Sequence, residues 1–290
     1  MTTPTGARSY LYVPGDRPDR LALADRRGAD AVIADLEDAV APGSRAEALL
    51  GVAAFLAQDG FAAQRWVRVE PSPGPEQLSA VVQPSLTGIV LPKAEPESLT
   101  ALDDALSRCE HVAGLPVGGT VVLALVESAR GLRRLDEIAA APRVVRLGLG
   151  EADLRAELGI DPSPDARELL PLRLAVVVAS AAAAIAPPVA PASTDFRDLE
   201  ALRESTAALA RLGFRARTSI HPAQVPVINA AFTPTADQVE RARDVVAVYE
   251  AALAQGRGAA VARDGRMVDV AVVRWARDVL SRQTSPDDGS

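Results

Sequence analysis

Residues 32–49, VIADLEDAVAPGSRAEAL, begin as a strand and end as a helix, with three carboxylates between the two parts. The apolar run before Asp35, Glu37 and Asp38 places these acids near the edge of a core, where like charges repel one another. Burying them is costly unless a positive group compensates for their charge. The stretch therefore predicts a strand–helix unit and a positive partner for its acids.

The same alternation of strand and helix recurs along the chain. Several β-like runs are apolar on both faces, which is typical of strands buried beneath helices. Eight strand–helix units in 290 residues predict an α/β fold, a (β/α)8 TIM barrel. A doubly wound open sheet is the alternative, and the lack of GxGxxG after the first strand weighs against it. The eight runs cover residues 9–15, 29–38, 65–70, 88–95, 120–128, 144–153, 189–196 and 216–224.

The last part of the chain lies beyond these eight units. The eighth unit is expected to end near Gln255, so residues 1–255 form the predicted catalytic barrel. AAVAR (259–263) and RMVDV (266–270) flank Asp264-Gly265, a favourable two-residue hairpin turn, and a helical pattern follows. We therefore predict a C-terminal hairpin–helix lid over residues 256–282 and a disordered tail over 283–290.

Composition excludes several classes of partner. The net charge of −7 argues against nucleic acid, because phosphate contacts need a basic face. The longest uncharged apolar stretch, residues 174–186, is too short to cross a bilayer core of roughly 30 Å. Cys109 is the only cysteine, so no intrachain disulfide can form, and the first residues lack the apolar core of a signal peptide. We expect a cytoplasmic protein with neither a nucleic-acid nor a membrane partner.

The chemistry of an α/β barrel lies at the carboxyl ends of its strands. Any single acid there can be a solvated loop residue, but many acids on one rim indicate a site. Reading only those ends gives Asp35, Glu37, Asp38, Arg68, Glu70, Lys93, Glu95, Glu127, Glu151, Asp153 and His221.

Two of these acids are suited to binding a metal. Glu127 closes the apolar run TVVLALVE, and Asp153 ends the next strand region. Two carboxylates with room for waters and substrate oxygens are what Mg²⁺ or another hard cation takes. Zinc is disfavoured, because the chain has only two histidines and one cysteine.

Two basic residues on the rim have open roles. Lys93 follows an apolar strand and could form a Schiff base with a ketone substrate, or could pair with Glu95 or another rim acid. Arg68 could hold a carboxylate by two parallel bonds and stabilise an oxyanion, or could be a solvated or salt-bridged arginine.

Several motifs together resemble the citrate lyase β-subunit-like CoA-ester lyases of the HpcH/HpaI aldolase superfamily. The resemblance covers nearly the whole chain in family order, and the tail GRGAAVARDGRMVDVAVVRWA is similar to the family's lid. Two departures are Glu70, where the family usually shows Asn, and Glu157, where Asp is common. The motifs include RSYLYVPGDRPDR (8–20), GADAVIADLEDAVAPGSRAEA (28–48), LVESARGL (125–132), GLGEADLRAELG (148–159) and SIHPAQVPVIN (219–229).

The resemblance implies roles for individual residues. It implies a usually trimeric TIM barrel, with Mg²⁺ (or Mn²⁺) on Glu127 and Asp153 and with Arg68 on the substrate carboxylate or thioester oxygen. Asp269 of the lid matches the acid that serves as the base in malate-synthase-like members and is expected to reach a neighbouring subunit. Glu37 is assigned to the catalytic set through the outer metal shell. The expected substrate-binding residues, besides Arg68, are Asp35, Pro14 and Gly15.

The implied reaction breaks or makes a C–C bond next to a CoA thioester through an enolate. The substrate is then a β-hydroxyacyl-CoA such as a malyl-CoA, citramalyl-CoA or HMG-CoA-like ester. Alternatives are a citrate lyase β-subunit acting on an acyl-carrier protein, a malate-synthase-like thioesterase and a pyruvate-dependent class II aldolase. A non-catalytic barrel is disfavoured by the presence of Arg68, Glu127, Asp153 and Asp269.

Overall fold

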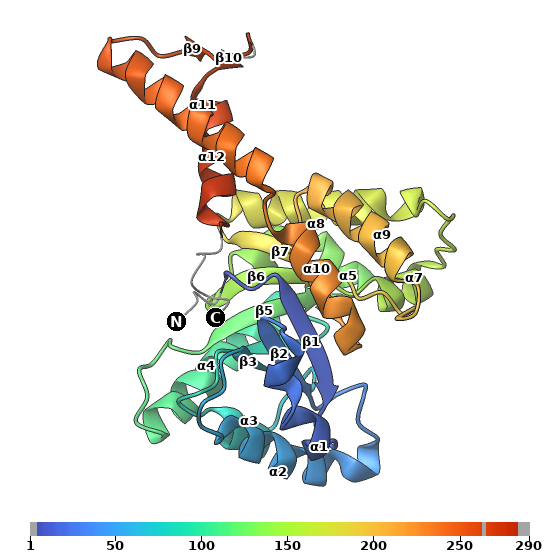
Figure 1. The fold of residues 1–290 in the computed structure, drawn as a ribbon. Coiled ribbons are helices and arrows are strands. Elements are labelled where there is room, and N and C mark those ends of the chain that lie inside the picture. The colour runs from blue at the N-terminus through green and yellow to red at the C-terminus, as the bar shows by residue number, and fades with distance from the viewer. Residues whose placement is uncertain (1–4, 263–264, 284–290) are drawn as a thin grey trace. The chain divides into compact units, whose positions relative to one another are not determined.

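The computed structural model describes residues 5–262 and 265–283. The chain divides into two compact units, one ending at Ala230 and the other beginning at Ala231. The first is a closed barrel of parallel strands whose order around the ring follows the sequence, so the predicted TIM barrel is confirmed (Figure 1). Its strands are β1 (Ser9–Pro14), β2 (Ala31–Asp35), β3 (Gln64–Arg68), β4 (Gly88–Leu91), β5 (Val121–Val126), β6 (Val144–Leu149), β7 (Ala186–Ala190) and β8 (Ala216–Ser219).

Helices follow the strands and cover the outside of the barrel (Figure 1). Their inward faces and the outward faces of the strands form one large apolar core, which includes Leu11, Val52, Leu78, Leu106 and Val176. The helices are α1 (Pro18–Leu21), α2 (Arg45–Leu56), α3 (Pro75–Val81), α4 (Pro96–Val112), α5 (Ala129–Arg133), α6 (Leu135–Ala139), α7 (Glu151–Leu158), α8 (Leu170–Ala182), α9 (Leu199–Leu212) and α10 (Val225–Phe232). Short 3-10 helices cover Ala24–Arg27, Pro42–Ser44, Arg167–Leu169 and Pro222–Gln224.

A second, smaller core fills the barrel interior. Its members include Tyr10, Ile33, Trp66 and Leu123, and the rings of Tyr10 and Trp66 meet edge to face with centroids 5.8 Å apart. Successive side chains of a strand point to opposite faces, so the residues two positions further on also face inward. By this alternation, four polar side chains face the barrel interior at its carboxyl end: Tyr12, Asp35, Arg68 and Glu127.

The amino end of the barrel contains a buried arginine that the sequence did not single out. Arg146 of β6 is 1% exposed. It donates to the carbonyl oxygens of Ala7 (2.8 Å) and Pro187 (2.7 Å) and to the hydroxyl of Tyr10 (3.1 Å). These acceptors satisfy a charged group in an otherwise apolar interior.

The predicted bounds of the seventh strand were wrong. The strand was expected over residues 189–196, but β7 is Ala186–Ala190 and includes Pro187 and Pro188. Proline lacks a backbone N–H yet accepts extended backbone, so it is tolerated where the strand ladder is irregular. The register between β6 and β7 does shift in this region, which accommodates the two prolines.

The second unit contains α11 (Ala236–Ala254), β9 (Ala260–Val261), β10 (Met267–Val268) and α12 (Val270–Ser281). The antiparallel pairing of β9 with β10 confirms the predicted hairpin, while Asp264 lies outside the described residues. Val239 and Ala242 of α11 pack with Ala276 and Val279 of α12.

The predicted division into barrel, lid and tail stays a prediction. α11, which was expected as the eighth barrel helix, groups with the second unit. Residues 284–290 of the predicted tail are outside the described part. None of the helices in the described ranges is long and apolar enough to cross a membrane.

Candidate active site

Arg68 and Asp35 form a two-pronged ion pair at the carboxyl ends of β3 and β2. Arg68 Nε donates to Asp35 Oδ1 at 2.7 Å, and Nη2 donates to Oδ2 at 2.6 Å. The backbone N–H groups of Glu37 and Ala39 also donate to this carboxylate, each at 3.1 Å. Because Arg68 is 9% exposed and Asp35 is 1% exposed, the pair is fixed in a region of low dielectric.

The other two acids of the DLED stretch also contact this guanidinium. Arg68 Nη1 lies 2.9 Å from Glu37 Oε2 and 3.1 Å from Asp38 Oδ2, so Arg68 is the positive partner that the three carboxylates require. Glu37 Oε2 is buried and, besides this ion-pair contact with Arg68, accepts no hydrogen bond from the described residues. Burial raises the pKa of Glu37 to about 7, the negative charges of Asp38 and Asp35 add to the rise, and Arg68 opposes it. Glu37 is therefore a carboxyl group able to exchange a proton near neutral pH.

β1 supplies one wall of the site. The guanidinium carbon of Arg68 lies 4.9 Å from the centroid of the Tyr12 ring, within cation–π range. Burial raises the pKa of Tyr12 well above its ordinary value, despite the opposing charge of Arg68, so the phenol stays protonated.

After the strand, Gly15 donates its N–H to the carbonyl of Asp35 at 2.8 Å. A Cβ on Gly15 would lie 2.7 Å from that oxygen, so the Pro14-Gly15 turn needs glycine to approach β2 closely.

Glu127, which follows β5, is 5% exposed. Its Oε1 accepts the backbone N–H of Lys93 at 2.8 Å, and none of the described residues donates to its Oε2. Burial raises the pKa of Glu127 to about 7, and the charges of Asp153 and Glu37 add to the rise. The site therefore holds an excess of negative charge around Glu127.

Asp153 and Glu127 belong to neighbouring strand–loop units. β5 and β6 pair in register up to Val126 and Leu149, and α7, which carries the exposed Asp153, begins two residues further on. A Cβ on Gly150 would lie 2.6 Å from Glu127 Oε2, so glycine at 150 leaves room for the Glu127 carboxylate. Within residues 5–262 and 265–283, no three histidine, cysteine, aspartate or glutamate side chains cluster for a metal. A cation here would take two protein carboxylates, with water or substrate completing its shell.

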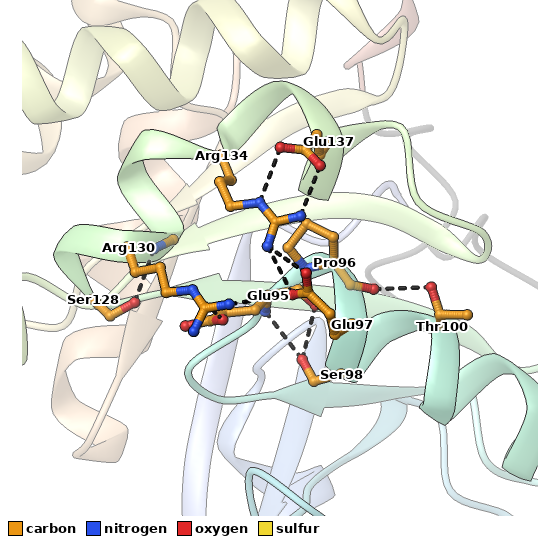
Figure 2. Close-up of polar contacts among 10 residues, drawn as sticks. Glu95, Pro96, Glu97, Ser98, Thr100, Ser128, Arg130, Arg134 and Glu137 are labelled. Atoms are coloured by element: carbon orange, nitrogen blue, oxygen red, sulfur yellow. Dashed lines mark hydrogen bonds and ion pairs between the residues drawn. The ribbon is translucent and has the colours of Figure 1, made fainter.

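Lys93 does not form the ion pair with Glu95 that was one of its predicted roles. Its side chain is exposed, and its backbone is in the left-handed region with φ 48°. Glu95 pairs instead with Arg130 of α5 at 3.0 Å, and Glu97 pairs with Arg134, as Figure 2 shows. These contacts join the start of α4 to α5 and to the residue that follows α5.

Three other predicted positions have local structural roles. Glu70 pairs with Arg45, and His221 Nδ1 accepts the N–H of Ala223 at 3.1 Å as its ring stacks on Phe196. Asp269 lies in the second unit, where its Oδ1 accepts the N–H groups of Ala271 (2.9 Å) and Val272 (3.0 Å) and caps α12. The N-cap role makes the first turn of α12 depend on Asp269.

Sequence reasoning missed Tyr12, Gly150 and the backbone N–H of Lys93. Tyr12 could have been found, because it lies two residues after the inward-facing Tyr10 in SYLYVPG. The roles of Gly150 and of the Lys93 N–H depend on close approach between segments far apart in the sequence, so no local pattern indicates them.

Comparisons of the sequence with known proteins show which family the chain belongs to. Residues 8–222 match the model of the HpcH/HpaI aldolase/citrate lyase family. The chain belongs to this family. It is 31% identical to the citrate lyase subunit beta of Leuconostoc mesenteroides subsp. cremoris, over 94% of this chain and 92% of that one. It is 33% identical to a (3S)-malyl-CoA thioesterase of Cereibacter sphaeroides, over 95% of this chain and 94% of that one.

A solved structure is similar over almost the full length. The protein CitE of Mycobacterium tuberculosis, in complex with magnesium, acetoacetate and coenzyme A, superposes with a TM-score of 0.77 at 30% identity. The match covers 96% of this chain and 98% of that one, so it includes the C-terminal part as well as the barrel.

Proposed function

We propose that this protein is a Mg²⁺-dependent carbon–carbon lyase that cleaves or forms a β-hydroxyacyl-CoA through an enolate. The observation that carries the proposal is that buried Arg68 and buried Glu127 both lie at the carboxyl end of the barrel, with Asp153 on the helix that follows the next strand. The names of the relatives support it, because citrate lyase subunit beta and L-malyl-CoA/beta-methylmalyl-CoA lyase share about a third of their residues with this chain. The bound magnesium and coenzyme A of the similar CitE structure support the same assignment.

The residues present fit a hard divalent cation. Glu127 Oε2 has no protein donor among the described residues. Burial, and to a smaller extent the charges of Asp153 and Glu37, raise the pKa of Glu127, and a cation would offset both effects. Glu127 and Asp153 would hold Mg²⁺, or Mn²⁺ in its place, which when bound polarises substrate oxygens as a Lewis acid.

Arg68 is assigned to the developing negative charge. Asp35 accepts two of its N–H groups, and this fixes the orientation of the guanidinium before substrate arrives. Asp35 was predicted to bind substrate, and we propose that it acts there by orienting Arg68. Pro14-Gly15 forms the adjoining turn, which we assign to the substrate-binding wall.

Proton transfer is assigned to two carboxyl groups. In the cleavage direction Asp269 takes the proton of the β-hydroxyl group, the C–C bond breaks and an enolate of the acyl thioester forms. Glu37, whose pKa is near 7, can supply a proton next to Arg68. Protonation of the enolate carbon gives the shorter acyl-CoA and a carbonyl acid.

We propose that Asp269 reaches the site as part of a lid that residues 256–282 form. Lids of this kind exclude water, which would otherwise quench an enolate. We further propose a homotrimer in which each lid serves a neighbouring barrel, and a cytoplasmic location.

Two neighbouring activities are the alternatives. The relatives named citrate lyase subunit beta favour a subunit that acts on a carrier-protein thioester, and those named (3S)-malyl-CoA thioesterase favour hydrolysis after or instead of cleavage. Assaying free CoA and acyl-CoA products separately distinguishes hydrolysis from cleavage.

Chelation tests the role of the metal. EDTA should abolish the cleavage of β-hydroxyacyl-CoA esters, Mg²⁺ or Mn²⁺ should restore it, and Glu127→Gln and Asp153→Asn should be inactive at wild-type stability. Activity that survives exhaustive chelation, together with a borohydride-trapped adduct on Lys93, would establish the Schiff-base mechanism instead.

A further inference from the structure

The helix that carries Asp153 has little apolar anchorage. α7 (Glu151–Leu158) has eight residues, and Leu154 is the one that is buried. A single buried side chain leaves rotation and tilt of a short helix poorly fixed, so its placement depends on polar contacts at its two ends.

The contact at the carboxyl end of α7 joins it to the segment that carries Glu127. Glu157 Oε2 accepts the backbone N–H of Ala129 at 3.0 Å. Ala129 is the first residue of α5, two positions after Glu127, and its N–H is one of those that a helix leaves without an internal partner. The Glu157 carboxylate therefore bridges the segment of Glu127 and the helix of Asp153.

The contact at the amino end of α7 joins it to α8. Arg173 Nε donates to Glu151 Oε1 at 2.6 Å, and Nη2 donates to Oε2 at 2.9 Å. The two side chains are only 14% and 13% exposed, so the pair has a fixed bidentate geometry and little screening by solvent. By contrast, the pair of Arg134 with Glu97 in Figure 2 has side chains 25% and 62% exposed. Exposed pairs of that kind contribute only about 0–1 kcal/mol.

We infer that Glu157, Glu151 and Arg173 are positioning residues that fix the separation of Glu127 and Asp153 and thereby set the affinity for the divalent cation. The inference rests on the proposed function, because it takes Glu127 and Asp153 as the ligands. None of the three positioning residues is assigned as a ligand of the cation. Loss of partners that orient metal ligands typically weakens metal binding by about 10–100-fold.

The test measures Mn²⁺ affinity of the metal-free full chain by titration calorimetry, with thermal unfolding of the same samples recorded without metal. Glu157→Ala removes the acceptor for Ala129, whereas Glu157→Gln retains an oxygen that can accept the same N–H. Arg173→Met removes the bidentate pair at similar side-chain length. Arg134→Met is the matched control, because it breaks an ion pair that touches neither α7 nor Glu127.

We expect Glu157→Ala and Arg173→Met each to raise the Kd for Mn²⁺ by 10-fold or more, and Glu157→Gln and Arg134→Met to stay within threefold of wild type. The metal-free melting temperature of Glu157→Ala should equal that of the wild type, since Glu157 is exposed. If Glu157→Ala and folded Arg173→Met both bind Mn²⁺ with wild-type affinity, the positioning inference is overturned and the assigned metal site stands. A wild-type chain that binds Mn²⁺ no better than Glu127→Gln would overturn the assigned metal site, and the inference with it.

Discussion

Arg68 and Asp35 are register partners on adjacent strands, and their side chains join through two parallel hydrogen bonds of 2.7 and 2.6 Å. The third guanidinium nitrogen, Nη1, faces Glu37 and Asp38. A sheet register set by backbone pairing therefore determines the orientation of Arg68 at the carboxyl end of the barrel.

Replacing Arg68 with lysine keeps the positive charge but removes the planar fork. Since loss of one oxyanion donor costs about 10²–10³ in rate, Arg68→Lys should lower kcat/KM by about that factor. Steady-state kinetics on the preferred CoA ester measure the effect, and Arg45→Lys, at an exposed pair with Glu70, is the control. Near-wild-type kinetics for Arg68→Lys would reduce Arg68 to a structural ion-pair residue.

Glu110 of α4 is predicted to contribute to stability rather than to catalysis. Burial would raise its pKa, but hydrogen bonds from Arg143 and from the backbone N–H groups of Thr120 and Gly118 lower it to about 2. Breaking one partner of a buried ion pair costs about 3–5 kcal/mol, so Glu110→Gln should lose about 3 kcal/mol in urea unfolding at pH 7.

The pH dependence of that difference follows from the sign of the shift. Because the pKa of Glu110 is lower in the folded chain than its ordinary 4.5, its stabilisation is complete above 4.5 and is lost as pH falls toward about 2. The gap between the wild type and Glu110→Gln should therefore narrow from pH 5 to pH 2.5. Glu97→Gln, at an exposed pair, should match the wild type throughout. A gap independent of pH would show that ionisation of Glu110 is not its source.

Gly88 leaves space for the Trp66 ring in the core of the barrel interior. A Cβ at this position would lie 2.5 Å from Trp66 Cζ3 and 2.6 Å from the carbonyl oxygen of Val121. Overpacking of this kind costs about 1–3 kcal/mol, so Gly88→Ala should lower the urea midpoint. Gly43→Ala is the control, because nothing lies within 4 Å of its added Cβ. Equal midpoints for the two variants would mean that the Trp66 ring moves aside freely.

Asp269→Asn separates the proposed base from its structural role, since asparagine caps a helix about as well as aspartate. We expect the rate to collapse while CoA-ester binding persists. Mixing inactive Asp269→Asn with inactive Glu127→Gln subunits should then restore part of the activity, because some sites pair an intact barrel with an intact lid. No recovery after confirmed subunit exchange would rule out a shared site.

The sequence predicted the barrel, because the alternation of apolar strand runs with helical patterns is a local signal, and the ends of those runs predicted the rim that holds the site. Asp35 and Arg68 could be placed on the rim in this way, but their mutual pairing depends on strand register. The start of β7 was missed because Pro187 and Pro188 indicated only the end of the preceding helix, whereas they are themselves part of the strand. Arg146 could not be predicted, since its acceptors at Ala7, Tyr10 and Pro187 come from distant parts of the chain.

The most direct test of the central claim is product analysis. The protein is incubated with Mg²⁺ and a panel of β-hydroxyacyl-CoA esters, with Glu127→Gln in parallel, and products are identified by mass spectrometry. We predict that the wild type converts at least one ester into a shorter acyl-CoA and an equimolar carbonyl acid, and that Glu127→Gln converts none. Intact esters throughout, or free CoA without any C–C cleavage product, would contradict the assignment as a carbon–carbon lyase.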